Sequence, residues 1–441
     1  MHRHPPAAEA TAAKNPMRRI AVASGTGTLI EAYDFQIYGV AAALVFPKVF
    51  FPALGTAAGT VASFATLGVA FVARPLGSIV FGHFGDRLGR KRTLVTTLLL
   101  MGFATMLIGM TPTAGQIGVA APIIITLLRF VQGLAFGGEW AGATLLAAES
   151  APKARRGFYA MFGSFGAAVA ICLANATFLV TGLTMSQDAF VDYGWRIPFL
   201  LSGVLVGVGL FVRLKIDESA VFEGEMSRRG AAAAPFVEAV KSQPRQFLLG
   251  SGVMVMTFAL FYLSVGYLAA YGTSVLDLSR TSVLSIGLVS GLVLAVSLVV
   301  AAVLSDRVGR RRVIAAAGVA AVVWSLVLFP VLDQGSTVFY AVGVCGTLFI
   351  AGVAYGPVSA FIPELFMTRY RYTATGFCYN VSGVIGGAVP SVVAAAIISA
   401  YGSFAFGAAL AALCMITVVC TLALGETRDY EMDRVEAVVT A

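Results

Sequence analysis

Twelve long apolar runs constrain this 441-residue chain more than any other feature of its sequence. A helical run of about 20 residues crosses a hydrocarbon layer of roughly 30 Å. The runs are continuous, whereas the strands of a membrane barrel alternate apolar and polar residues. The expected spans are 20–46, 58–82, 93–111, 117–147, 157–182, 196–214, 246–275, 282–304, 312–332, 336–362, 372–399 and 402–424.

The composition agrees with a lipid environment. Apolar residues make up 58% of the chain and charged residues only 12%, and the mean hydropathy is +0.87. A water-soluble globule of this size would not tolerate such values. The sequence therefore predicts an all-α membrane protein with twelve transmembrane helices.

A basic turn occurs twice in the chain. Asp86-Arg87-Leu88-Gly89-Arg90 returns 220 residues later as Asp306-Arg307-Val308-Gly309-Arg310, each time after the second span of a half. This repeat predicts two pseudo-symmetric six-helix bundles. The expected segments are a tail over 1–19, bundles over 20–214 and 246–424, a linker over 215–245 and a second tail over 425–441.

The positions of Lys and Arg predict the orientation. With the N-terminus in the cytoplasm, 25 of the 30 basic residues fall on the cytoplasmic side, and Lys48, Arg196 and Arg280 fall opposite. Both termini are then cytoplasmic in a multi-pass protein of the cell membrane. Residues 1–19 lack the pattern of a signal peptide. Topology accounts for the net charge of +8, so no nucleic-acid partner is expected.

Cysteine and histidine offer little chemistry. All five cysteines lie within expected spans without CxxC spacing, as packing residues do. The three histidines lie in the N-terminal tail and at position 83, so none is expected at membrane depth. No metal site, cofactor or enzymatic nucleophile–base pair is expected.

Ionisable side chains inside apolar spans are costly, and each one suggests a function. Glu31, Asp34 and Tyr38 share one face of the first span because they lie three and seven residues apart. Asp34 follows Arg19 by 15 residues, which places it roughly 22 Å into the membrane, near the midplane.

Further charges occur in the second and fourth spans. Arg129, Gln132 and Glu139 lie on one side of the fourth span, and Arg74 lies in the second. Matched by depth, Asp34 is expected to pair with Arg129, and Arg74 with Glu139. A buried ion pair can also be purely structural, and that interpretation stays open for Arg74 and Glu139.

The expected pair of Asp34 and Arg129 suggests an exchange of partners. Burial and a nearby guanidinium act on the carboxyl in opposite directions, so we expect Asp34 to titrate near the working pH. Protonated Asp34 would release Arg129, whose planar fork suits a substrate carboxylate. Glu31 is the rival proton carrier, and the sequence does not choose between the two acids.

The opposite wall of a substrate site is expected from the seventh, tenth and eleventh spans. Tyr262, Tyr355 and Asn380 offer hydroxyls and an amide without charge. Tyrosines in spans also serve as packing residues or interface anchors, and that alternative stays open.

The duplicated turn and the segment Arg129-Phe-Val-Gln132-Gly133 resemble the major facilitator superfamily over nearly the whole chain. Segments 31–39, 74–77, 137–140 and 195–199 resemble its metabolite:proton symporter family, which carries shikimate, 2-oxoglutarate, citrate and proline/betaine. The resemblance implies import of a small organic acid with a proton, by alternating access, in a protein that works as a monomer.

The resemblance also assigns a cytoplasmic gate, although the basic residues could merely fix topology. Its residues are Asp86, Arg87, Gly89, Arg90, Glu149, Arg156, Asp306, Arg307, Arg310, Glu364, Arg369 and Arg371. Three positions depart from the family pattern: Ala302 replaces a glycine, Ala32 a tryptophan and Met367 a proline.

Other functions stay open at this point. A symporter of a zwitterion such as proline or betaine would use Glu31 or Glu139 and a cage of tyrosines. A metabolite or drug exporter is a further possibility. A membrane enzyme or sensor is disfavoured, because neither a catalytic constellation nor a soluble output domain is evident in the sequence.

Overall fold

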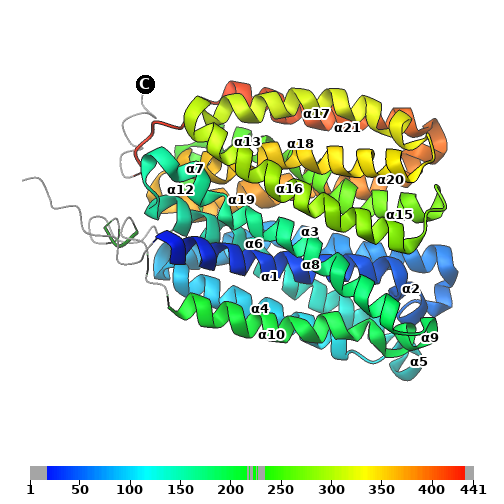
Figure 1. Ribbon diagram of the computed structural model, residues 1–441. Coiled ribbons are helices and arrows are strands. Elements are labelled where there is room, and N and C mark those ends of the chain that lie inside the picture. The colour runs from blue at the N-terminus through cyan, green and yellow to red at the C-terminus, as the bar shows by residue number, and fades with distance from the viewer. Residues whose placement is uncertain (1–16, 216–217, 219–221, 225, 227–233, 433–441) are drawn as a thin grey trace, which may run out of the picture.

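The computed structural model describes residues 17–215, 218, 222–224, 226 and 234–432. Within these residues every regular element is a helix, and the helices form two bundles that lie side by side (Figure 1). Ten described helices are long and apolar enough to cross a membrane. The expected all-α membrane fold with twelve crossing segments is confirmed.

The first six crossing segments form the N-terminal bundle. They are α1 (Met17–Leu44), α3 (Gly55–Leu88), α4 (Arg90–Met110), α6 (Ala120–Ser150), α7 with α8 (Arg156–Ala160 and Phe162–Thr184) and α10 (Arg196–Leu214). Short helices complete the connections: α2 (Phe46–Val49), α5 (Ala114–Ile117) and α9 (Gln187–Ala189).

The last six crossing segments form the C-terminal bundle. They are α13 to α15 (Pro244–Val253, Val255–Tyr262 and Leu268–Ser274), α16 (Arg280–Val308), α17 (Arg310–Leu332), α18 (Thr337–Glu364), α19 with α20 (Arg371–Ser382 and Val389–Tyr401) and α21 (Ser403–Ala423).

Two segments of the C-terminal bundle contain π-helical turns. The turn η4 (Leu263–Tyr267) lies between α14 and α15, and η6 (Gly383–Ala388) lies between α19 and α20. A side chain at Gly386 would collide with the backbone of Val255, so η6 and α14 approach closely. Such turns interrupt regular hydrogen bonding and commonly mark functional positions.

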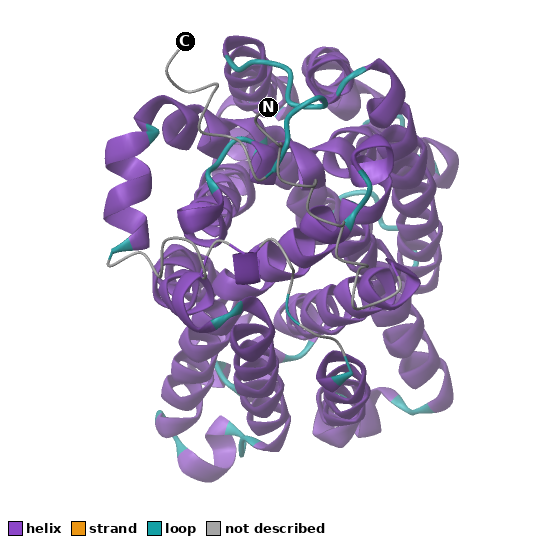
Figure 2. Cartoon of the chain, turned by 90° about the vertical axis from the view of Figure 1, so that its left-hand side faces the viewer, coloured by secondary structure: helices purple, strands orange, loops and turns teal. Residues whose placement is uncertain are grey.

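The bundles meet along α8 with α16 and along α3 with α19. The first residues of α1 and the last residues of α21 lie at the same end of the molecule (Figure 1). We call this end the terminal face. Figure 2 looks onto it, with the helices seen close to end-on.

The linker and tails are described in part. Helix α12 (Pro235–Ser242) starts at one linker proline, and α13 starts at the next, Pro244, because proline suits the first turn of a helix. Most of the expected N-terminal tail, residues 1–16, lies outside the described residues. The domain boundaries expected from the sequence stay predictions.

Candidate functional site

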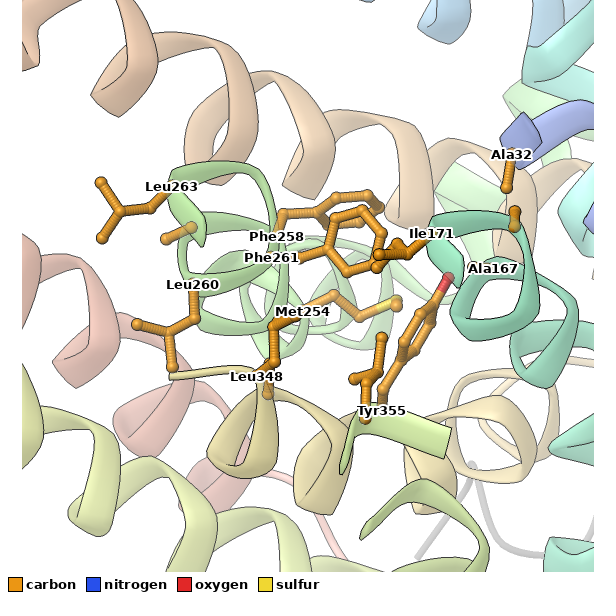
Figure 3. Close-up of a cluster of buried hydrophobic side chains, with 14 of the residues drawn as sticks. Ala32, Ala167, Ile171, Met254, Phe258, Leu260, Phe261, Leu263, Leu348 and Tyr355 are labelled. Carbon is orange, nitrogen blue, oxygen red and sulfur yellow. The ribbon is translucent and has the colours of Figure 1, made fainter. Parts of the chain in front are cut away.

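A cavity of about 450 Å³, counting its open mouth, lies between the bundles. Phe258, Phe261 and Tyr355 extend toward Ala32 and Ala167 of the other bundle (Figure 3). Among the described residues no charged side chain lines it. The lining residues are Thr28, Ala32, Phe35, Gln36, Phe136 and Ala167 from one bundle, and Thr257, Phe258, Phe261, Tyr262, Tyr355 and Tyr379 from the other.

Asp34 lies fully buried behind this lining. Its carboxylate accepts hydrogen bonds from the hydroxyls of Thr105, at 2.7 Å, and of Ser202. The expected ion pair between Asp34 and Arg129 is wrong, since none forms within 4.0 Å. Hydroxyl donors from α4 and α10 occupy the carboxylate instead.

Asp34 and Arg129 are nevertheless linked. Arg129 Nη1 donates to Gln132 Oε1 at 2.8 Å, and Gln132 Nε2 donates to Thr105 Oγ1 at 2.6 Å. Thr105 in turn donates to Asp34. We call these four side chains the Asp34 relay. The guanidinium of Arg129 also lies 3.9 Å from the ring centroid of Tyr38, which explains why Tyr38 faces it from α1.

Arg74 does not meet Glu139, so the second expected pair is also wrong. Its guanidinium carbon lies 3.8 to 4.4 Å from the ring centroids of Phe35, Phe71 and Phe136. Its Nη1 donates to the hydroxyl of Tyr262, from the other bundle, at 3.2 Å. Matching by depth along the helices did not identify the partner of either side chain.

Glu139 pairs with Arg213, a residue that the sequence analysis counted among the cytoplasmic basic residues. Arg213 Nη1 lies 3.0 Å from Glu139 Oε2, which also accepts from Thr97 Oγ1 at 2.7 Å. Gly27 of α1 provides the space for the Arg213 guanidinium, since a side chain at position 27 would collide with it. The pair lies outside the cavity lining, and this arrangement favours the structural interpretation of Glu139.

Glu31 is 1% exposed, and neither carboxyl oxygen has a hydrogen-bond partner among the described residues. It lies one helical turn from Asp34 and beside the lining residue Ala32. A buried carboxyl without donors is expensive as a carboxylate.

The opposite wall contains two of the three uncharged groups expected there, Tyr262 and Tyr355. Tyr355 and Tyr379 share a hydrogen bond of 3.2 Å between their hydroxyls. Trp140 stacks on Tyr379 with ring centroids 4.0 Å apart, and Asn380 donates to the carbonyl of Gly137 at 2.9 Å. Asn380 is buried and is absent from the cavity lining, contrary to expectation.

The duplicated turns join the bundles at the terminal face. Asp86, at the end of α3, accepts from the backbone nitrogens of Tyr372 and Thr373 at 3.2 and 3.0 Å. It also accepts from the Thr373 hydroxyl at 2.7 Å. We call this contact the first latch. A carboxylate suits the N-terminus of α19 because the helix leaves backbone donors unpaired there.

The second latch repeats this geometry with the bundles exchanged. Asp306, at the end of α16, accepts from the backbone nitrogens of Gly157 and Phe158 at 2.8 and 3.0 Å. These residues open α7 of the N-terminal bundle. Each aspartate of the repeated turn therefore binds the start of a helix in the other half.

Buried ion pairs flank both latches. Each glutamate binds one arginine of its own bundle and one of the other. The contacts are Arg90 and Arg371 (2.9 Å) on Glu149, and Arg310 (2.6 Å) and Arg156 (3.1 Å) on Glu364. The side chains of both glutamates are 0% exposed, so their charges require these partners.

The remaining expected gate residues have other contacts. Arg87 is exposed and bonds His83 at 3.1 Å, and Arg369 pairs with Glu238 of α12 at 2.6 Å. The carbonyl of Arg307 accepts from Arg428. Gly89 has φ of +106°, a conformation that L side chains rarely adopt, and this explains the glycine of the turn.

Described residues of the C-terminal segment lie over the latches. The carbonyl of Tyr430 accepts from Arg156 at 3.0 Å, and that of Met432 accepts from Arg371 at 2.7 Å. Thr427 donates to Glu364 at 2.6 Å. The segment thereby touches arginines of both bundles.

A family model described as Major Facilitator Superfamily matches residues 25–390 of this chain. The chain belongs to the major facilitator superfamily. It is therefore a membrane transporter rather than an enzyme.

Individual relatives indicate which kinds of transporter this chain is similar to. This facilitator is 40% identical over 423 residues to the inner membrane metabolite transport protein YhjE of Escherichia coli, covering 95% of this chain and 96% of that one. It is 37% identical over 428 residues to the shikimate transporter of the same organism, covering 95% and 97%. The proline/betaine transporter of E. coli is 29% identical, over 86% and 77% of the two chains.

Solved structures share the fold of this facilitator. The proton:xylose symporter XylE, bound to 6-bromo-6-deoxy-D-glucose, superposes with a TM-score of 0.75 at 16% identity, covering 96% of this chain and 98% of that one. The human organic anion transporter MFSD10 gives a TM-score of 0.68 at 15% identity, covering 92% and 100%.

Several polar residues around the facilitator's cavity escaped the sequence analysis. Thr105 and Ser202, which bind Asp34, are hydroxyl residues within apolar runs and carry no distinctive pattern. Arg213 was recognisable as a charge close to a span, and Trp140 as an aromatic residue between glycines. Their partners become evident only once the helices are packed.

Proposed function

We propose that this facilitator imports a small carboxylate-bearing metabolite together with protons across the cell membrane. The observation that carries the proposal is the Asp34 relay, which links a buried carboxyl to a buried guanidinium beside the cavity. Similarity to a shikimate transporter supports an organic acid as cargo.

Charge balance provides the mechanism. Protonating Asp34 removes a negative charge from the relay, so the positive charge of Arg129 is no longer offset and the cavity wall attracts an anion. Glu31 offers a second protonation site on the same helix. Proton and anion then cross together, because each compensates the charge that the other brings into a medium of low dielectric constant.

The terminal face is proposed to be cytoplasmic, with both termini inside, because it carries most Lys and Arg residues. Its two latches would then form the cytoplasmic gate, closed in this structure and parted when the cavity opens inward. The protein is proposed to act as a monomer, since cavity, relay and latches all come from a single chain.

Uptake in proteoliposomes tests the proposal. Labelled shikimate and 2-oxoglutarate should accumulate only with an inside-alkaline proton gradient, and an uncoupler should abolish the accumulation. Accumulation that survives the uncoupler would disprove proton symport.

Betaine tests the second candidate function, a symporter of zwitterions. Seven aromatic side chains line the cavity, as a cage for a quaternary ammonium would require. Proton-driven uptake of betaine without uptake of either acid would favour this alternative over an organic acid. Outward pumping under the same gradient would instead indicate an exporter.

A further inference from the structure

Arg74 is a buried cation whose hydrogen-bonding capacity is largely unused. Its side chain is 0% exposed, and only Nη1 has a partner, the hydroxyl of Tyr262. Nε and Nη2 have no hydrogen-bond partner among the described residues. No described acidic side chain lies within 4.0 Å of it. A guanidinium buried in this way is costly unless another group accepts its remaining hydrogen bonds and balances its charge.

The unused atoms have a specific geometry. Nε and Nη2 form one edge of the guanidinium plane, and their N–H bonds point in parallel. That edge can donate two parallel hydrogen bonds to the two oxygens of one carboxylate. A lysine ammonium offers no such fork.

Arg74 lies directly behind the cavity lining. Three of its contacts, with Phe35, Phe136 and Tyr262, are with lining residues, and the guanidinium carbon lies 3.8 Å from the Phe136 centroid. The aromatic faces stabilise the positive charge by cation–π contact.

Arg129 occupies a different position. Its Nε and Nη2 also lack a hydrogen-bond partner among the described residues, but its Nη1 donates into the Asp34 relay. Of the two rings that its guanidinium contacts, Phe35 lines the cavity and Tyr38 does not. Arg129 is thus connected to the proposed proton site. Arg74 is connected instead to the C-terminal bundle, through Tyr262.

We infer that Arg74 is the carboxylate-binding residue of the transport site, and that Tyr262 connects the bound anion to the opposite bundle. This inference rests on the proposed function. The carboxylate accepts two hydrogen bonds from Nε and Nη2, while Nη1 keeps its bond to Tyr262. Binding of the anion thereby fixes the one polar contact that the described residues make between Arg74 and the C-terminal bundle, which favours closure over the substrate.

The test compares variants in proteoliposomes, using whichever of labelled shikimate or 2-oxoglutarate the wild type accumulates. Arg74→Lys keeps the charge and loses the fork, so KM should rise about tenfold to a hundredfold, while the pH dependence of uptake stays that of the wild type. Arg129→Lys should change the pH dependence. Arg196→Lys is the matched control, because Arg196 donates to the carbonyls of Gly109 and Thr111 away from the cavity, and its KM should not change.

Tyr262→Phe tests the connection between the bundles. The anion still binds Arg74 in this variant, so KM should change less than about threefold, whereas the maximal rate should fall several-fold. It also keeps the inference testable if Arg74→Lys does not fold, as judged by thermal unfolding in detergent.

The outcomes separate the two proposals. A wild-type KM in folded Arg74→Lys, or an unchanged maximal rate in Tyr262→Phe, would overturn the inference and leave the proposed function standing. Absence of proton-driven carboxylate uptake by the wild type would overturn the proposed function itself, whatever the variants do.

Discussion

Asp34 is held by two hydroxyl groups rather than by a guanidinium, and this choice of partner affects how readily it can exchange a proton. Hydroxyls of Thr105 and Ser202 can reverse their roles and accept a hydrogen bond from a protonated carboxyl. An arginine cannot, because it only donates. The site can therefore hold either protonation state without rearranging its helices.

Asp34→Asn tests the coupling role at this residue. The amide cannot release a proton, so uphill accumulation under a proton gradient should be lost, while exchange with preloaded substrate should persist in part. The measurement is uptake at several pH values with and without internal substrate. If Asp34→Asn keeps the wild-type pH dependence, the coupling role passes to Glu31.

Glu139→Gln should destabilise the fold, because it leaves Arg213 buried without a counter-charge. Breaking a buried ion pair from one side costs about 3–5 kcal/mol, so thermal unfolding in detergent should occur at a clearly lower temperature. The double variant Glu139→Leu/Arg213→Met should recover much of the loss. A raised KM at unchanged stability would instead show that Glu139 contacts substrate.

The identity of the buried charged residues was predictable, but their partners were not. Periodicity placed Asp34 and Tyr38 on one face of α1, and helical rise estimated their depth. The direction in which Arg74 and Glu139 point depends on how α3 and α6 pack, and Gly27 alone made room for Arg213. Matching residues by their depth cannot reveal the space that a glycine leaves for a side chain of another helix.

At the scale of elements, the latches depend on the close approach of α3 and α19. A Cβ atom at Gly82 would lie 2.8 Å from Thr373 Cα, closer than real side chains approach. The equivalent position in the second copy is Ala302, which is fully buried, so that repeat accommodates a methyl group. The family resemblance assigned both turns to one gate, and helix packing makes the two latches unequal.

Gly82→Leu should therefore push α3 away from α19 and weaken the first latch. Spin labels at the exposed positions Leu88 and Val308 should report longer distances across the terminal face. Gly68→Leu, in the same helix, is the control, since nothing lies within 4 Å of a Cβ atom there. Unchanged distances in folded Gly82→Leu would show that this approach does not keep the face closed.

At the scale of the whole molecule, the described part of the C-terminal segment braces the two bundles together. Its carbonyls accept from Arg156 of one bundle and Arg371 of the other. The twelve spans were predictable from hydropathy. This segment was expected only as a tail, because its contacts with Arg156 and Arg371 use backbone carbonyls, which leave no trace in a sequence.

Ending the chain after Leu424 should favour opening of the terminal face. The truncation removes Thr427 from Glu364 and two carbonyls from buried arginines, so the labels at 88 and 308 should separate and thermal stability should fall. Lys153→Ala serves as control, since its pair with Glu431 is about half exposed and contributes at most about 1 kcal/mol. A truncated protein that matches the wild type in both measurements would rule out a bracing role.

The aromatic lining of the cavity has a consequence for the cell that houses this protein. The charged residues near the cavity lie behind aromatic rings. The empty cavity therefore offers an inorganic cation no charged ligand to replace its hydration shell. We therefore expect the empty carrier to conduct few inorganic cations, so that many copies can remain in the bilayer without draining the membrane potential.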